Sequence, residues 1–243
     1  MITKKYVSYT VYGDIHKYLE ILISNVVFLK ANDFYVVIYC DKENVNLISS
    51  KLSDALVLDG STFGIKNKML WRLNPIFDTF SNSFFPRDAD SLISEREIEL
   101  MNLFLESNKS FHIIRDHVLH FMPIMGGLFG VKIEIYHLFT LKNVKNLLFN
   151  VDNVYNFDQL FLADYIYPLI AKHSLIHTSS YHYINEVFSK VNKVDNYCGK
   201  YANESVSKFD MVDDYVDIVN RRSIHYFLAK IFRYRWFLFF KKV

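Results

Sequence analysis

The sequence predicts an α/β fold in which an open β-sheet carries helices on its faces. Strand-like and helix-like segments alternate along the start of the chain, and this order is typical of such sheets. One strand-like segment, residues 34–39 (FYVVIY), is almost continuously apolar, as expected for a strand covered on both faces. The chain has 243 residues, of which 51% are hydrophobic, so we expect one well-buried domain.

The first elements show the clearest pattern. Residues 5–12 are rich in β-branched and aromatic types and end at Gly13, which predicts a first strand. Apolar residues recur at helical spacing over residues 15–26 and 45–52, which predicts a helix after each of the first two strands. Residues 55–58 predict a third strand. In sheets of this kind, ligands bind in the crevice beyond the carboxyl ends of the strands.

Further elements follow a fourth short apolar run at Phe84 and Phe85. Ser94 and Glu97 have the spacing of a capping box, which predicts the start of a helix. Later apolar segments predict two more strands, a helix that begins near Asp158 and a last short strand; the strands span residues 111–114, 128–133 and 175–177.

Composition limits the cellular setting. The two cysteines, Cys40 and Cys198, form no ligand-like pair, which favours a reducing, cytoplasmic compartment. We expect neither a signal peptide nor a transmembrane helix, because no apolar run is long enough.

The end of the chain differs from the rest, since no acidic residue follows Asp217 while basic and aromatic residues are frequent there. We therefore expect a domain at residues 1–205 and a basic, aromatic, helical extension at residues 206–243. This tail favours contact with the inner face of a membrane and not with nucleic acid; packing on the body is the alternative.

The central motif is Asp88-Ala89-Asp90, which follows the fourth apolar run. Side chains two residues apart point the same way in an extended segment, so both carboxylates could address one site. Such an oxygen-rich site suits Mn²⁺ or Mg²⁺. The metal would bridge the phosphates of a ligand and offset charge on a departing diphosphate. A solvated turn is the alternative interpretation.

Five motifs occur in a fixed order around these aspartates. They are MLWR (69–72), RDADS (87–91), SEREIE (94–99), a segment with RDH and a GG turn (111–132), and YNFDQLFLADYIYP (155–168). The set resembles a group of GT-A glycosyltransferases from bacterial surface-polysaccharide clusters and large viruses, over roughly residues 5–200. The resemblance implies a GT-A, Rossmann-like fold with a mixed, mainly parallel sheet, a divalent metal and a nucleotide-sugar donor, with a UDP-sugar as our choice.

On this resemblance, Asp88 and Asp90 match the DxD motif that binds metal and diphosphate, with Asp90 as the direct metal ligand. Such enzymes commonly supply a late histidine as a third ligand. We choose His177, with His173 and His182 as alternatives; a surface or capping role is the other interpretation.

Asp158 and Gln159 resemble the DQ pair that lies beneath the donor sugar in retaining members. Asp158 would then bind sugar hydroxyls, and Gln159 would lie near the anomeric carbon. If Asp158 were instead a general base, the reaction would invert configuration. Capping of the following helix is the structural alternative for Asp158.

A polar cluster beside the GG turn predicts a pocket wall, with Asp116 joining the catalytic set as a ligand of sugar hydroxyls; the cluster comprises Arg115, Asp116, His117, His120, Gly126 and Gly127. The two glycines would allow close approach to a ligand. Arg72 and Arg87 are candidates for diphosphate or sugar contacts, or for structural ion pairs with nearby carboxylates. Tyr9, Tyr12 and Gly13 end the first strand, where nucleotide bases stack in this fold; a core role is the alternative for Tyr12.

The main hypothesis is thus a metal-dependent hexosyltransferase that acts on a glycan or a lipid-linked glycan. A noncatalytic sugar-nucleotide or glycan-binding module is the second. A metal-dependent nucleotidyltransferase or phosphohydrolase is the third, disfavoured because no Gly-rich phosphate loop is present.

Overall fold

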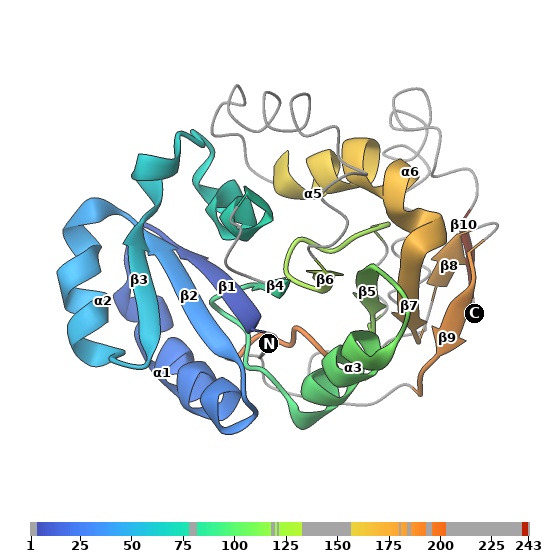
Figure 1. Cartoon of the computed structure of the whole chain (residues 1–243), viewed down its shortest axis with the longest axis horizontal. Coiled ribbons are helices and arrows are strands. Elements are labelled where there is room, and N and C mark those ends of the chain that lie inside the picture. The colour runs from blue at the N-terminus through green and yellow to red at the C-terminus, as the bar shows by residue number, and fades with distance from the viewer. Residues whose placement is uncertain are drawn as a thin grey trace, which may run out of the picture.

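An eight-stranded sheet runs through the described part of the chain in the order β3-β2-β1-β4-β6-β5-β7-β9 (Figure 1). The computed structural model describes residues 4–77, 82–117, 120, 122–132, 157–179, 181–183, 186–192, 196–202 and 240–242. Every pairing is parallel except those of β6, which is antiparallel to both of its neighbours. The strands are β1 (Lys5–Val11), β2 (Tyr35–Cys40), β3 (Ala55–Asp59), β4 (Ser83–Arg87), β5 (Phe111–Arg115), β6 (Phe129–Lys132), β7 (Ser174–Thr178) and β9 (Phe188–Lys190).

Helices cover both faces of this sheet. One face carries α1 (His16–Ala31), α2 (Val45–Lys51) and α3 (Glu95–Glu106), with the short 3-10 helix η1 (Lys42–Asn44) leading into α2. The other face carries the 3-10 helix η3 (Lys68–Phe77) and the segment α5 (Phe157–Phe161), η5 (Leu162–Ile166, a π-helix) and α6 (Tyr167–Ile170). The short 3-10 helices η2 (Gly60–Phe63) and η6 (Ala171–His173) lie in connections. The predicted mixed, mainly parallel α/β sheet with helices on both faces is therefore confirmed.

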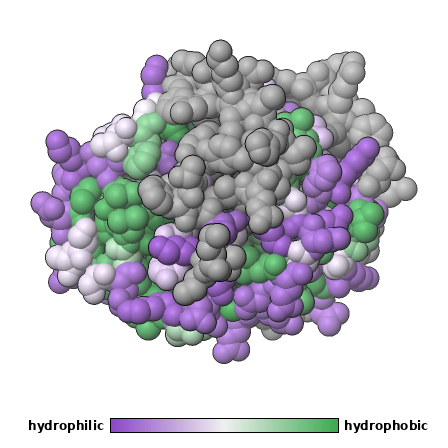
Figure 2. Space-filling view, in the orientation of Figure 1, coloured by the Kyte–Doolittle hydropathy of each residue, from purple (hydrophilic) through white to green (hydrophobic). Residues whose placement is uncertain are grey.

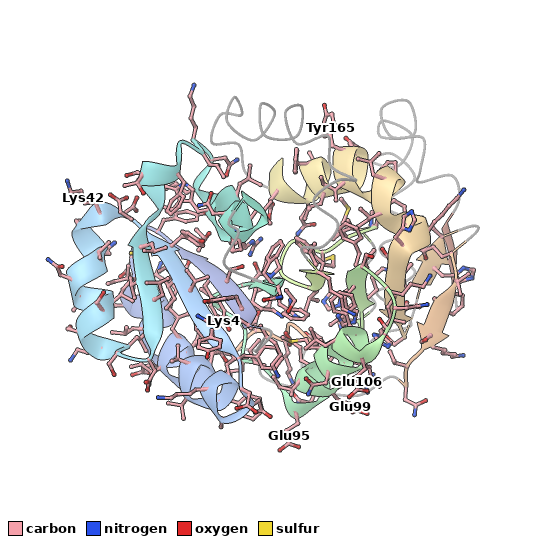
Figure 3. All side chains as sticks on the ribbon, viewed as in Figure 1. Lys4, Lys42, Glu95, Glu99, Glu106 and Tyr165 are labelled. Carbon is pink, nitrogen blue, oxygen red and sulfur yellow. The ribbon has the colours of Figure 1, made fainter. Side chains whose placement is uncertain are left out.

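Alternation along the strands divides the core into two apolar clusters. In β2, Val36 and Ile38 pack with α1, whereas Val37 and Tyr39 pack with η3 on the opposite face. Successive side chains of a strand point to opposite faces, so a continuously apolar strand is what a doubly covered sheet requires. Three acidic residues of α3 lie outside this core: Figure 3 shows Glu95, Glu99 and Glu106 at the periphery, and all three are exposed.

The edge strand β3 is less completely covered. Leu56 is exposed there, and Figure 2 shows hydrophobic residues on this side of the surface among hydrophilic ones. Among the helices of the described ranges, none combines the length and apolar character that a membrane crossing requires.

A second, two-stranded sheet pairs β8 (Tyr181–Tyr183) with β10 (Phe240–Lys242), antiparallel. Sequence patterns did not predict β8, β9 or β10. Apart from β10, the predicted tail helix falls on residues outside the described ranges, as do residues 203–239 as a whole. The helical extension therefore stays a prediction.

Candidate active site

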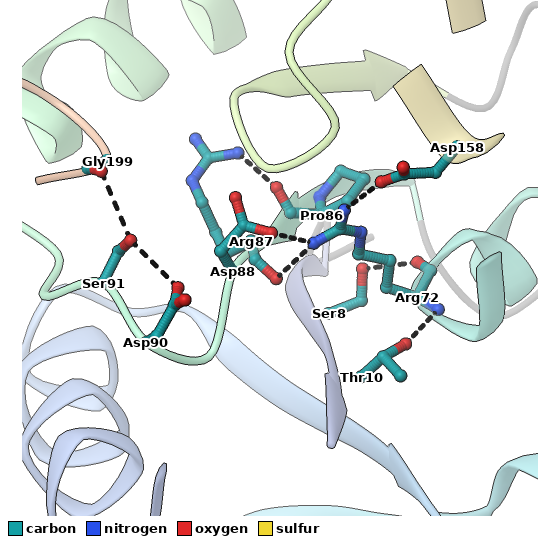
Figure 4. A network of polar contacts seen from close by, with 10 residues as sticks. All are labelled: Ser8, Thr10, Arg72, Pro86, Arg87, Asp88, Asp90, Ser91, Asp158 and Gly199. Atoms are coloured by element: carbon teal, nitrogen blue, oxygen red, sulfur yellow. Dashed lines mark hydrogen bonds and ion pairs between the residues drawn. The ribbon is translucent and has the colours of Figure 1, made fainter. Parts of the chain in front are cut away.

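The centre of the candidate site is the guanidinium group of Arg72, which lies between two carboxylates (Figure 4). Arg72 Nη1 is ion-paired with Asp88, the first residue after β4, and Nη2 donates to Asp158 Oδ2 at 2.6 Å. Asp158 lies in the first turn of α5. The sheet thus brings the RDADS and DQ motifs together at the carboxyl end of β4, and Arg72 of the WR motif joins them.

Strand β1 fixes the backbone of Arg72. Ser8 Oγ donates to the carbonyl oxygen of Arg72, and the backbone N–H of Arg72 donates to Thr10 Oγ1, each at 2.8 Å. Burial alone would lower the pKa of Arg72, but the charges of Asp88 and Asp158 outweigh it and raise the pKa. The guanidinium therefore stays charged and positioned.

Gly126 and Gly127 pack directly against this cluster. An ideal Cβ on Gly126 would lie 2.5 Å from Asp158 Oδ2 and 2.7 Å from Arg72 Nη2. One on Gly127 would lie 2.0 Å from Asp88 Oδ2. The groups that approach the two glycines in this structure are the site's own carboxylates and arginine; the approach of a ligand to the glycines stays a prediction.

Asp90 is half-buried in the loop after β4 and is held on one side by residues 199–202. Its carbonyl oxygen accepts from the N–H of Ala202 at 3.0 Å, and Ser91 Oγ lies between Asp90 Oδ1 and the carbonyl oxygen of Gly199. Burial and, next, the charge of Asp88 raise the pKa of Asp90. A cation beside the two carboxylates would relieve this unfavourable charge.

The donor set of the motif fits a hard divalent cation that shares its coordination with a ligand. Asp88 and Asp90 supply carboxylate oxygens, the type that Mn²⁺ and Mg²⁺ prefer. In the described ranges, no group of three His, Cys, Asp or Glu side chains is placed to hold a metal. Mg²⁺ is commonly held by one or two carboxylates together with substrate phosphates, so these two residues match a metal–diphosphate site.

The structure does not bring the predicted third ligand, His177, into a metal-binding group with the aspartates. His177 Nδ1 lies 2.8 Å from His112 Nε2, and His112 stacks on Phe104. Burial lowers the pKa of His177 to about 4. The alternative ligands, His173 and His182, are not in such a group of described residues either. His173 is exposed, and His182 stacks on Phe188.

A second polar cluster follows β5. Asp116 is buried and receives two hydrogen bonds from Arg96 of α3, at 2.7 and 2.8 Å, and one from the N–H of Cys198. Arg115 is fully buried and donates to both carboxylate oxygens of Glu186 at 2.6 Å.

Three aromatic rings, those of His117, His120 and Tyr197, contact one another in this second cluster. The His117 ring stacks on Tyr197 at 4.0 Å, and His120 meets both rings edge-on. Burial, followed by His117, lowers the pKa of His120 to about 3. Of the predicted pocket-wall residues, His117 and His120 are thus in contact, Arg115 and Asp116 are engaged in ion pairs, and Gly126 and Gly127 lie at the first cluster.

Two predicted ligand contacts take structural positions instead. Arg87 is buried and ion-paired with Glu97 of α3, which is the alternative role that the sequence left open. Tyr9 is fully buried in the core, so the expectation that it stacks on a nucleotide base is corrected. Tyr12 and Gly13 directly follow the carboxyl end of β1, and Gly13 has φ 73°. Gln159 is half-buried beside Asp158.

The capping box is realised only in part. Ser94 accepts from the N–H of Glu97, but the Glu97 carboxylate turns to Arg87. Sequence reasoning therefore missed Glu97 as an ion-pair partner, together with Arg96 and Glu186. Glu97 and Arg96 were interpreted only as part of the start of a helix, so their distant partners were not sought. Glu186 belongs to no motif.

The comparisons with known proteins concern the fold. No protein-family model matches the sequence, and no curated protein matches it significantly. The chain is similar in structure to a glycosyltransferase involved in the glycosylation of the major capsid of PBCV-1, with 12% identity, a TM-score of 0.45, and 72% of this chain and 81% of that chain covered.

Two further solved structures illustrate the range of activities. The glycosyltransferase GlyE of Streptococcus pneumoniae matches with 14% identity and a TM-score of 0.49, covering 71% of this chain and 45% of that chain. The 4-diphosphocytidyl-2C-methyl-D-erythritol synthase of Anaerococcus prevotii matches with 13% identity and a TM-score of 0.47, covering 88% of this chain and 99% of that chain. At such identities no residue role is transferred.

Proposed function

We propose that this chain is a metal-dependent glycosyltransferase that moves a hexose-type sugar from a nucleotide sugar, with a UDP-sugar as the first candidate, to a glycan or lipid-linked glycan. The observation that carries the proposal is the Asp88–Arg72–Asp158 cluster at the carboxyl end of β4. It joins a motif suited to a metal–diphosphate to a carboxylate suited to a sugar. Fold alone would not separate this activity from others.

Each group has a stated task in this proposal. Asp90 and Asp88 would hold Mn²⁺ or Mg²⁺, which supplies compensation for the negative charge of the departing diphosphate. Arg72 keeps Asp88 and Asp158 at fixed positions. Catalysis would come mainly from positioning and from electrostatic stabilisation.

Asp158 is proposed to bind the donor sugar. Its Oδ2 is paired with Arg72, while Oδ1 is buried and has no hydrogen-bond partner among the described residues, so we propose it as an acceptor for a sugar hydroxyl. A carboxylate held in a buried ion pair suits binding better than proton transfer, because its charge is already engaged. We therefore propose the retaining outcome, with Gln159 nearest to the anomeric carbon.

A product assay tests the activity class. The full chain with Mn²⁺ is incubated with UDP-glucose, UDP-galactose and the corresponding GDP-, CDP- and dTDP-sugars, and released nucleotide and pyrophosphate are measured. Release of a nucleoside diphosphate is expected, with the sugar passing to an added saccharide acceptor or, without one, to water. In a parallel reaction with the nucleoside triphosphates and a sugar 1-phosphate, release of pyrophosphate would instead identify a nucleotidyltransferase. Stabilisation by a nucleotide without turnover in either reaction would identify a noncatalytic binding module.

Matched variants connect the assay to the site. Asp158→Asn should abolish turnover, whereas Asp54→Asn removes an aspartate of an exposed ion pair before β3 and should leave turnover unchanged. NMR of the product's anomeric proton then distinguishes retention from inversion. Full activity of Asp158→Asn would overturn the role given to this residue.

The basic tail is proposed to bring the enzyme to a membrane that carries a lipid-linked acceptor. Its composition supports this, because basic and aromatic residues together favour an anionic surface. Salt-sensitive binding to anionic vesicles should be lost when residues 221–243 are deleted. No binding by the full chain would contradict the proposal.

A further inference from the structure

The apolar face of α1 contains one fully enclosed polar side chain. Leu22, Val26 and Leu29 on this face are buried in the core, and Asn25 lies among them with 1% of its surface exposed. A buried amide is unfavourable unless its hydrogen bonds are made. The Asn25 amide therefore needs hydrogen-bond partners, whereas an apolar side chain such as leucine would need none at this position.

Two hydrogen bonds of Asn25 go to the loop that carries the metal motif. Asn25 Nδ2 donates to the carbonyl oxygen of Ser91, and Asn25 Oδ1 accepts from the N–H of Ile93, each at 2.9 Å. These contacts span 66 and 68 positions of sequence. Because both go to backbone atoms, Asn25 fixes the path of the loop directly after Asp90.

The opposite side of the same loop contacts residues 199–202. Ser91 forms an isolated antiparallel bridge with Tyr201, and the N–H of Ala202 donates to the carbonyl oxygen of Asp90. The loop thus lies between this segment and α1. Asn25 connects the loop to α1, a 16-residue helix packed on the sheet.

Repulsion between the two carboxylates of the loop makes such a contact useful. Asp88 and Asp90 carry like charges two residues apart, and their repulsion favours a loop that separates them. Side chains that orient metal-binding carboxylates through such indirect contacts commonly change metal affinity when they are replaced.

We propose that Asn25 is a positioning residue that holds the Asp88–Asp90 loop in the shape that binds a metal–diphosphate. The inference rests on the proposed function for its ligand, and on the two hydrogen bonds for its mechanism. No sequence motif includes Asn25. Its one signal is a polar residue at a position where helical spacing calls for an apolar one.

The test compares a substitution in α1 with one at Asn32, the residue that follows this helix. Asn25→Leu removes both loop contacts and keeps an apolar face of similar volume. Asn32→Leu removes an amide that donates to the carbonyl oxygen of Phe28 in α1 and, among the described residues, makes no contact with the Asp88–Asp90 loop. Binding of Mn²⁺ in the presence of UDP is followed by the loss of the free Mn²⁺ signal in electron paramagnetic resonance.

We expect Asn25→Leu to weaken Mn²⁺ binding by about tenfold or more and Asn32→Leu to change it by less than about twofold. If Asn25→Leu does not fold, Asn25→Asp is measured instead. This variant keeps an acceptor for the N–H of Ile93 but lacks the donor to the carbonyl oxygen of Ser91, and we expect the same weakening of Mn²⁺ binding. A folded Asn25 variant that binds Mn²⁺ as the unmodified chain does would overturn the proposal.

Failure of the proposed function can be told apart from failure of this inference. If the unmodified chain does not bind Mn²⁺ with UDP, the metal–diphosphate assignment fails. Hydrogen exchange of the Ile93 amide in the ligand-free protein then decides the role of Asn25. Faster exchange in Asn25→Leu but not in Asn32→Leu supports it, and unchanged exchange overturns it.

Discussion

Arg72 Nη2 donates to Asp158 Oδ2 at 2.6 Å and so joins residues that lie 86 positions apart in the sequence. Both side chains are buried, at 7% and 3% exposure, whereas Asp88, the other partner of Arg72, is 47% exposed. The cluster is therefore anchored at Asp158 and open toward solvent at Asp88. A charged ligand would meet it from the Asp88 side.

Loss of the Arg72 guanidinium should lower the stability of the folded protein. Arg72→Met leaves the Asp158 carboxylate buried without a counter-charge, and we expect the free energy of unfolding to fall by about 3–5 kcal/mol. Urea denaturation measures it. Lys30→Met is the control: it breaks the exposed pair with Asp54, so a change of about 1 kcal/mol or less is expected. Equal effects of the two substitutions would contradict the buried role of Arg72.

The close packing of Gly127 leads to a second prediction. In Gly127→Ala the new Cβ would overlap Asp88 Oδ2, so Asp88 must move and metal-dependent nucleotide binding should weaken. Gly130→Ala is the comparison, because its Cβ would meet the Phe85 ring at 2.6 Å in the core. The control should lose stability but keep Mn²⁺-dependent binding of UDP. Calorimetry on both variants checks this, and undiminished binding by Gly127→Ala would argue against the packing.

The buried carboxylate of Glu186 accepts hydrogen bonds from Arg115, from the Tyr167 hydroxyl and from the N–H of Tyr183. Tyr167→Phe removes the hydroxyl at 2.6 Å, and we expect a loss of about 1.5–3 kcal/mol because the acceptor is charged. Tyr165→Phe, at a 47% exposed position two residues earlier, should change stability by less than about 0.5 kcal/mol. Thermal unfolding of the pair tests this; equal melting temperatures would count against the buried hydrogen bond.

Acid should destabilise the protein through His177. Burial lowers its pKa from 6.5 to about 4 in the folded state, while the unfolded chain keeps the ordinary value. Between these values the unfolded state binds the proton, so stability is complete above pH 6.5 and falls as the pH drops toward 4. The contribution of this one group is at most about 3 kcal/mol. Urea unfolding at several pH values gives the free energy of unfolding as a function of pH. Between pH 6.5 and 4 this free energy should fall less steeply in His177→Gln than in the unmodified chain, and an equal fall would contradict the assignment.

Much of the sheet could be predicted because its strands are apolar on both faces. Residues 34–39, for example, lie within one position of β2. The start of α3 was also predictable, since Ser94 does cap it. By contrast, β8 and β9 are three residues each, and β10 pairs with β8 from the far end of the chain, so local periodicity carries too little signal for them.

The site was predictable where motifs meet and not where partners are distant. The motif order indicated that Asp88 and Asp158 belong to one site, but the choice of Arg72 as their link depends on the path of η3, which no periodicity indicated. Arg87 is a case in which a motif misled the prediction. Its position in the motif suggested a ligand contact, whereas tertiary packing pairs it with Glu97.

The most direct test of the central claim is a thermal-shift measurement of UDP, GDP, CDP and dTDP, each with and without Mn²⁺, on the unmodified chain and on Asp90→Asn. A nucleotide at about 100 times its Kd stabilises the folded state by about 2.7 kcal/mol. We expect one nucleotide to raise the melting temperature of the unmodified chain only with Mn²⁺. Asp90→Asn should lose this response while its unliganded melting temperature stays equal or rises, because the raised pKa of Asp90 marks an unfavourable charge in the folded state. An Asp90→Asn variant that responds as the unmodified chain does, or an unmodified chain that responds to no nucleotide, would contradict a metal–diphosphate site at Asp88 and Asp90.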